Sequence, residues 1–232
     1  MYHEQAALAL ADAGVTVSIV NPAPVKDFGG SLGVRTKTDG VDSLVLARYG
    51  ALLNPRAWTP PPQEARTLQA LLSRREAIAQ YSQRERNHLE KADATGTPPL
   101  IRQSLGDSIT FQEKQLAKLQ QEIDDHINKY PELKADRDLL TSIPAVGPQV
   151  GNHLLSVMHN HDFKSSEQLA AYLGLVPVER QSGTSVFGRP HLSKAGPARI
   201  RAVLYMAVIA CINVCKNTVK PKCLRSVPPC AS

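Results

Sequence analysis

A serine lies in a polar, glycine-punctuated stretch that carries several cations. Ser182 precedes Gly183, and four positively charged side chains are close in sequence: Arg180, Arg189, Lys194 and Arg199. A serine hydroxyl becomes a useful nucleophile when its proton is removed or when the negative charge that builds during attack is stabilised. Guanidinium and ammonium groups bind phosphate oxygens strongly. The stretch thus has the neighbours that attack on a phosphate needs, whereas the residues taken alone favour a turn at the Ser-Gly pair.

Two carboxylates, Asp39 and Asp42, stand three residues apart at the start of a predicted helix. Thr38 or Asp39 is a suitable cap for this helix, and the spacing places both acids on its first turn. Two carboxylates so placed can hold a divalent cation such as Mg²⁺, which prefers oxygen ligands. Acidic residues in a first turn are also favoured by the helix dipole, and the spacing alone favours that capping role.

Residues 139–158 predict two helices joined by a tight hairpin. Pro144 fixes φ in the turn, Gly147 allows a close backbone, and helical spacing resumes after Gln149. The free N–H groups at the start of the second helix are suited to binding a phosphate, so the pattern indicates a helix-hairpin-helix. An ordinary corner between two helices has the same pattern.

Positive charge is concentrated in the C-terminal part of the chain. From Tyr172 onward nine Lys and Arg residues oppose Glu179 alone, a net charge of +8, although the whole chain of 232 residues carries +6. This asymmetry predicts that the C-terminal part contacts a nucleic acid, and a generic basic surface is the alternative. The candidate nucleic-acid-binding residues are Gly147, Arg180, Arg189, Ser193, Lys194, Arg199 and Arg201.

The remaining elements must position these residues. Helical spacing covers residues 2–13, a β-branched run at 15–20 predicts a strand, and Asn-Pro-Ala-Pro at 21–24 predicts a break. After a stiff Pro-rich linker, two long helical patterns at 63–92 and 100–129 predict an antiparallel arm. The charges on this arm are typical of a solvated face.

The expected fold class is mainly α, with a small α/β remnant, a helical coiled-coil arm and an α-helical C-terminal domain that contains the helix-hairpin-helix. The expected domains are an α/β remnant at 1–57, a linker at 58–62, an arm at 63–135, a C-terminal domain at 136–216 and a disordered tail at 217–232.

The sequence shows neither a signal peptide nor an apolar run long enough to span a membrane, so a cytoplasmic protein is expected. Four cysteines near the C-terminus lack the spacing of a zinc site, and reduced thiols are expected. They are Cys211, Cys215, Cys223 and Cys230.

Five short motifs follow one another between residues 143 and 205. They are I-P-A-V-G-P, L-A-A-Y-L-G-L-V-P, R-Q-S-G-T-S, L-S-K-A-G and R-I-R-A-V-L-Y. In this order and spacing they resemble the C-terminal domain of the DEDD-type insertion-sequence transposases, the bridge-RNA-guided serine recombinases. Several ordered motifs are far more specific than any one of them.

This resemblance implies roles for the residues singled out above. Ser182 matches the serine that attacks a DNA strand and forms a phosphoserine link. The segment K-T-D-G-V-D-S-L-V-L-A resembles the one that supplies the last two acids of the family's RuvC-like, RNase H-type domain, so Asp39 and Asp42 become catalytic metal ligands for Mg²⁺. A structured guide RNA and a homo-oligomer are implied as partners.

The resemblance also predicts a truncated protein. The stretch from Tyr2 to Pro22 resembles the part that follows the family's Glu-Ala-Thr-Gly segment, so the first two acids are expected to lie before Met1. The sequence thus predicts a DNA transposase that is truncated at both ends and inactive by itself. The alternative is a non-catalytic nucleic-acid-binding protein or regulatory remnant.

Overall fold

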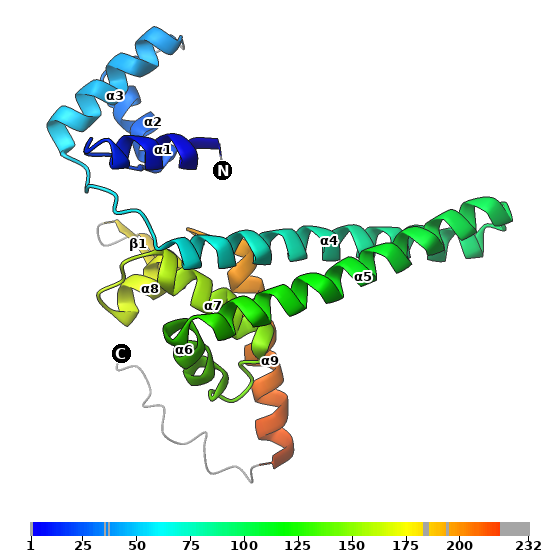
Figure 1. Ribbon diagram of the computed structural model, residues 1–232. Helices are drawn as coiled ribbons and strands as arrows, with labels where there is room; N and C mark the ends of the chain where they lie inside the picture. Colours follow the sequence, from blue (N-terminus) through cyan, green and yellow to red (C-terminus); the bar gives the residue numbers. More distant parts are fainter. Residues whose placement is uncertain (1, 35, 37, 183–185, 194, 219–232) are drawn as a thin grey trace. The chain divides into compact units, whose positions relative to one another are not determined.

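The chain is mainly helical, as the sequence predicts. The computed structural model describes residues 2–34, 36, 38–182, 186–193 and 195–218, and within these ranges it has nine helices and two strands (Figure 1). Contacts divide the chain into two compact units, Met1–Pro60 and Pro61–Ser232. None of the helices in the described ranges combines the length and the apolar character that crossing a membrane requires.

Three helices make up the first unit: α1 (Tyr2–Asp12), α2 (Pro22–Ser31) and α3 (Asp39–Leu53). The Asn21 side chain caps α2 by accepting the Ala23 N–H at 3.0 Å, and Pro22 occupies the first position, where its missing N–H costs nothing. The predicted break at this Asn-Pro pair is therefore wrong. The predicted cap of α3 is confirmed, since Thr38 Oγ1 accepts the Val41 N–H at 3.3 Å.

The predicted strand at residues 15–20 is also wrong. This segment is not assigned to any strand, and its contacts are with the residues that follow α3. The Trp58 N–H donates to the Val17 carbonyl at 2.7 Å, and Ser18 Oγ donates to the Pro55 carbonyl at 3.0 Å. A β-branched run forms a strand only where a second strand pairs with it, and the described residues of this unit contain none. The α/β remnant is absent from that part of the chain.

Two long helices, α4 (Gln63–Ala94) and α5 (Pro99–Lys129), form the arm of the second unit. They run side by side in opposite directions (Figure 1), with Arg86 Nη2 2.6 Å from Glu113 Oε1. α4 begins directly after the three prolines at 60–62, and α5 begins at Pro99, after Pro98; proline cannot continue a preceding helix. The predicted helices are thus present, while a coiled coil and pairing between copies of the arm stay predictions.

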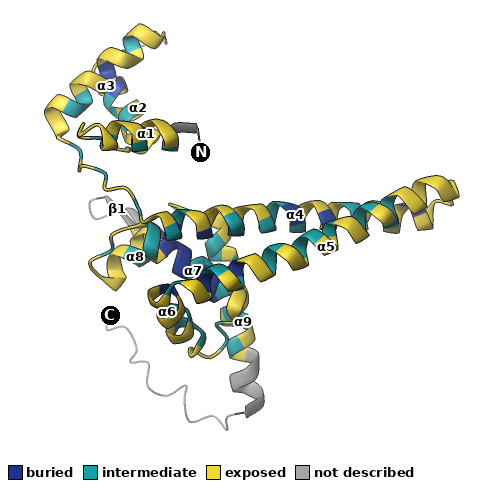
Figure 2. Cartoon of the chain, in the orientation of Figure 1, coloured by how far each residue is buried: buried dark blue, intermediate teal, exposed yellow. Residues whose placement is uncertain are grey.

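The core of the second unit lies at one end of this arm. Here α4 and α5 meet α6 (Pro131–Thr141) and α7 (Pro148–Asn160), and Figure 2 shows the buried residues gathered at this junction. The Asn160 amide donates to the Ala65 carbonyl at 3.0 Å and fastens the end of α7 to the start of α4. The buried cluster consists of Leu68, Leu72, Ile123, Ile127, Leu133 and Leu155.

The chain continues through α8 (Ser166–Tyr172), a hairpin of β1 (Pro177–Ser182) and β2 (Val186–Leu192), and α9 (Ala198–Thr218). The C-terminal domain is mainly helical, as predicted, but it also contains this hairpin, whose two strands satisfy each other's backbone groups. Residues 217 and 218 end α9, and the rest of the predicted tail, with Cys223 and Cys230, lies outside the described residues.

A carboxylate on the arm holds α7 and α9 together. Glu76 Oε1 on α4 lies 2.6 Å from Arg199 Nε on α9 and 3.1 Å from His153 Nε2 on α7. The carboxylate is largely buried, with 14% of its side chain exposed. Burial lowers the pKa of His153; the Glu76 charge opposes this shift, and Arg199 and Arg75 add to it. His153 is thus held in its neutral form, in which Nε2–H can donate to Glu76.

We expect the free energy of unfolding to fall as the pH drops from about 7 to about 5.5. The pKa of His153 is lowered in the folded chain, so the unfolded chain takes up the proton first, below the ordinary value of about 6.5. Urea unfolding at a series of pH values measures this slope. His153→Gln should flatten the slope, whereas His88→Gln, at an exposed site on α4, should leave it in place. An unchanged slope in His153→Gln would contradict the expectation.

Candidate nucleic-acid interface

Two glycines let the chain pass very close to itself at the base of the β1–β2 hairpin. Gly174 (φ +69°) follows α8, and Gly196 (φ +79°) precedes α9. A Cβ atom on Gly174 would collide with the backbone of Ala195, and one on Gly196 would collide with the Tyr172 carbonyl oxygen. Only glycine satisfies both the positive φ and the lack of room. We call this contact between residues 172–174 and 195–196 the backbone crossing.

Arg201, in the first turn of α9, binds both sides of the backbone crossing. Its Nη1 donates to the carbonyls of Leu173 at 3.0 Å, Ala195 at 2.8 Å and Gly196 at 3.2 Å. Three carbonyl oxygens that point to one place repel one another, and the positive charge of the guanidinium offsets this repulsion. The two ends of the hairpin are therefore held by a single side chain.

The hairpin extends from this crossing to the candidate nucleophile. The strands pair antiparallel, with Pro177 opposite Leu192 near the crossing and Ser182 opposite Val186 at the other end. The Ser193 N–H donates to the Val176 carbonyl at 3.0 Å and continues the ladder. The polar stretch is thus a hairpin up to Ser182, with an irregular register between Val178 and Arg180. The side chain of Ser182 lies outside what the structure describes.

The hairpin carries two of the predicted arginines, one on each strand. Arg180 pairs with Gly188, and the next residue is Arg189, whose side chain is exposed. Because successive side chains of a strand alternate between its faces, the register does not place Arg189 directly opposite Arg180. Ser193 is half-buried just after β2, and the Arg180 side chain and all of Lys194 lie outside the described part of the chain. Phosphate binding by these residues stays a prediction.

The two predicted cations of α9 have partners within the protein. Arg199 pairs with Glu76 and keeps 45% of its side chain exposed, whereas the half-buried Arg201 holds the backbone crossing. Cations in the first turn of a helix oppose its dipole, and here nearby oxygen atoms compensate for that cost. Arg199 is the one of these two cations that leaves much of its side chain open to an external anion.

The turn between α6 and α7 is as tight as the sequence predicts. Ala145 takes a left-handed backbone (φ 70°), and a Cβ on Gly151 would lie 3.1 Å from Thr141 Cγ2, so the two helices approach closely. Gly147 precedes α7 without a side-chain cap. That this turn binds phosphate as a helix-hairpin-helix stays a prediction.

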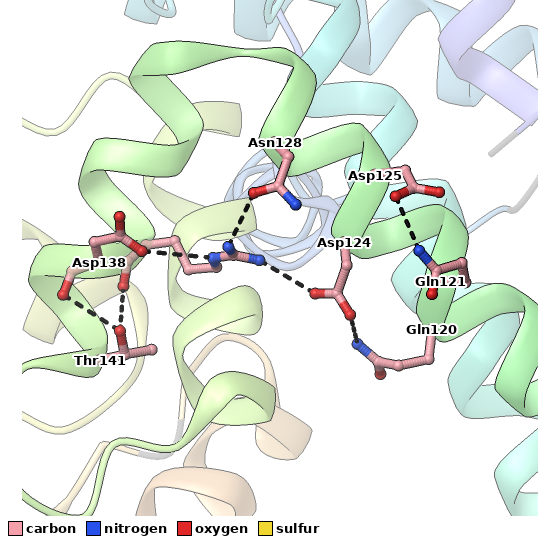
Figure 3. Close-up of polar contacts among 8 residues, drawn as sticks. Gln120, Gln121, Asp124, Asp125, Asn128, Asp138 and Thr141 are labelled. Atoms are coloured by element: carbon pink, nitrogen blue, oxygen red, sulfur yellow. Dashed lines mark hydrogen bonds and ion pairs between the residues drawn. The ribbon is translucent and has the colours of Figure 1, made fainter.

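An open cleft of about 650 Å³ adjoins the start of α7, and its charges nearly balance. Two arginines and two aspartates line it together with polar groups. Arg137 Nη1 donates to Asp124 at 3.1 Å, and its Nη2 donates to Asn128 at 3.2 Å. Figure 3 shows Asp124, Asn128 and Asp138 arranged around this guanidinium. Because Arg137 is occupied by these partners and the charges that line the cleft balance, the cleft is a weak anion site.

Asp39 and Asp42 are exposed in the first turn of α3, in the unit that does not contain Ser182. Asp42 lines a largely apolar cleft of about 830 Å³ together with residues of α2 and α3. Within the described residues, no three His, Cys, Asp or Glu side chains gather as a metal site would require. Mg²⁺ is commonly held by one or two carboxylates, with water and substrate phosphates completing its shell, so Asp39 and Asp42 would supply only the protein's part of such a site.

Sequence reasoning missed the backbone crossing and the part that Arg201 plays in it. Gly174 stands just after a helix, where a left-handed residue is common, so its position is a usable signal for a special backbone conformation. Gly196 lies before α9, where no such rule applies. The partners of Arg201 carry no such signal, since they are carbonyl groups that every residue possesses.

Both ends of the chain match models of transposase families. Residues 137–222 match the model described as "Transposase IS116/IS110/IS902 family", and residues 1–92 match a DEDD-type model described as "Transposase". The first match covers α7, α8, the hairpin and α9, and the second covers the whole first unit and most of α4.

Curated relatives agree with these matches. The chain is 35% identical over 194 residues to the pilin gene-inverting protein of Moraxella lacunata and 34% identical to that of Moraxella bovis, over 83% of the chain and 59% of each relative. The insertion element IS110 uncharacterized 43.6 kDa protein of Streptomyces coelicolor is 31% identical over 120 residues, 51% of the chain and 28% of the relative. The chain thus spans less than two thirds of the length of these relatives. The two family matches lie at 1–92 and 137–222, so the chain is similar to transposases of the IS116/IS110/IS902 family over both of these parts.

Proposed function

We propose that the chain takes part in DNA transposition, and that Ser182 is the nucleophile that cuts and rejoins the strands. The observation that carries the proposal is the match of residues 137–222 to the transposase model, which includes the hairpin that ends at Ser182. The relatives named as gene-inverting proteins support recombination of DNA as the activity.

The proposed step is an exchange of one phosphodiester for another. The Ser182 oxygen forms a bond to phosphorus and gives up its proton, while the bond from phosphorus to a deoxyribose oxygen breaks and that oxygen gains a proton. One phosphodiester is lost and one is made, so the step needs no external energy source. Reversal by a different deoxyribose hydroxyl would rejoin the strand to a new end.

Positive charge around the serine would stabilise the phosphorane-like transition state. Arg180 and Arg189 share the hairpin with Ser182, and Lys194 follows it. Arg199 is partly exposed at the start of α9 and would exchange its contact with Glu76 for one with phosphate. Such cations act most strongly when they are held in place before the reaction. We assign phosphate binding to these four residues, together with Ser193 and the turn at Gly147.

The family match to a DEDD-type model suggests use of a divalent metal ion, and Asp39 and Asp42 are the proposed ligands in this chain. The identity of the metal as Mg²⁺ rests on the preference of hard cations for carboxylate oxygen. Because the described residues do not complete its coordination, we derive no step through the metal. A structured guide RNA and a homo-oligomer are proposed as partners from the resemblance alone.

Trapping of a covalent adduct tests the nucleophile. The full chain, expressed in cells together with the DNA that flanks its gene, should yield a protein–DNA adduct that mass spectrometry locates on Ser182. The adduct should vanish in Ser182→Ala, because the attacking oxygen is gone. Ser73→Ala, at an exposed site on α4, is the matched control and should keep the adduct. An adduct on another residue, or none with wild type, would remove the catalytic proposal and leave a DNA-binding protein.

The salt dependence of DNA affinity tests the phosphate contacts. Each lost phosphate contact should lower the slope of log K against log salt by about 0.9. Arg189→Gln and Lys194→Gln should each show such a loss in a fluorescence-anisotropy titration with a mixed-sequence duplex. Lys118→Gln, at an exposed site on the arm, should leave the slope unchanged. Equal slopes in all of these variants would place the DNA elsewhere on the protein.

A further inference from the structure

The backbone crossing attaches the hairpin that carries Ser182 to α8 and α9 through a set of close, defined contacts. Both strands leave from it, and α8 and α9 join it on its other side. The crossing depends on two glycines and on one cation, the Arg201 guanidinium, which reaches carbonyls before β1 and after β2. No other side chain in the described part of the chain is hydrogen-bonded to both of these segments.

We propose that Arg201 is a positioning residue, whose contacts with Leu173, Ala195 and Gly196 set the direction of the hairpin and thereby the place of Ser182. The inference rests on the proposed role of Ser182 as nucleophile. It assigns Arg201 to the protein's own carbonyls, and so sets it apart from the cations that bind phosphate.

Geometry makes the crossing a sensitive place. Ser182 lies five residues beyond Pro177 along β1, which at about 3.3 Å per residue is roughly 16 Å from the base of the hairpin. A tilt of about 10° at the base would therefore move Ser182 by about 3 Å, by the same strand geometry. Displacement of a reacting group by about 1 Å can cost on the order of a hundredfold in rate.

The surroundings of Arg201 favour this role over phosphate binding. Its Nη1 has three carbonyl partners within 3.2 Å, and the side chain belongs to a half-buried residue. An anion at the same nitrogen would have to displace carbonyl groups that are fixed by the glycine backbone. Arg199, two residues earlier, has instead a single carboxylate partner and a side chain that is 45% exposed.

Hydrogen exchange in the full chain, followed by mass spectrometry, tests the proposal without DNA. Arg201→Met keeps much of the side-chain bulk but removes every donor, so amides of residues 176–193 should exchange about tenfold faster or more, while α4 to α7 stay protected. Arg201→Lys retains a cation that can donate to the carbonyls, and it should restore most of the protection. Arg201→Gln, with two donors and no charge, serves if the Met variant fails to fold. Arg102→Met, which breaks an exposed ion pair with Asp93, is the control.

The second measurement is the yield of the Ser182 adduct beside the affinity for a mixed-sequence duplex. Arg201→Met should lower the yield about tenfold or more, with less than about a threefold change in affinity and an unchanged salt slope. Unchanged hairpin exchange would overturn the proposal, and so would faster exchange throughout the second unit that Lys does not repair. A salt slope lowered by about one would overturn it in favour of a phosphate ligand. If wild type forms no adduct, the nucleophile assignment fails, and the exchange data alone decide whether Arg201 fixes the hairpin.

Discussion

The C-terminal part of this protein depends on one close contact of the backbone with itself. Gly174 and Gly196 remove the side chains that would keep two segments apart, and Arg201 supplies the positive charge that holds their carbonyls together. Without this contact the β1–β2 hairpin would be a two-stranded ribbon, which has little stability in water by itself. The crossing thus converts a weak local structure into one with a defined direction.

The second unit also has a conventional apolar core. Side chains from four helices bury one another where the arm meets α6 and α7, and α9 packs on α7 above them. The arm contributes polar contacts as well as apolar ones, since Glu76 reaches both α7 and α9. The residues that bind DNA in our proposal are therefore held by a helical framework. Within the described residues, the hairpin is its only sheet.

Local signals in the sequence predicted what depends on local physics. The cap at Thr38, the long helices of the arm and the tight turn before Gly147 all follow from propensity, capping and proline geometry. The two errors about strands have one common cause. Residues 15–20 have strand character but no partner, whereas residues 177–192 have turn-like composition but pair with each other. Whether a segment forms a strand depends on a partner strand, and a single sequence does not show which segments pair.

The candidate site was foreseeable to the same extent. The sequence shows the types and order of its residues. It does not show that Arg199 pairs with Glu76 while Arg201 binds the Leu173 carbonyl, because these partners are far away along the chain. The sequence already placed the carboxylates and the serine in separate predicted domains, at 1–57 and 136–216.

The shared oxygen of Glu76 has a thermodynamic consequence. Burial lowers the pKa of His153, and the charge of Arg199, which pairs with the same carboxylate, adds to this lowering. An anion that draws the guanidinium away leaves Glu76 paired with the His153 imidazole, and this stabilises the imidazolium. Linkage then requires that anion binding by Arg199 on α9 be accompanied by proton uptake by His153 on α7. A lower pH therefore strengthens the binding of the anion.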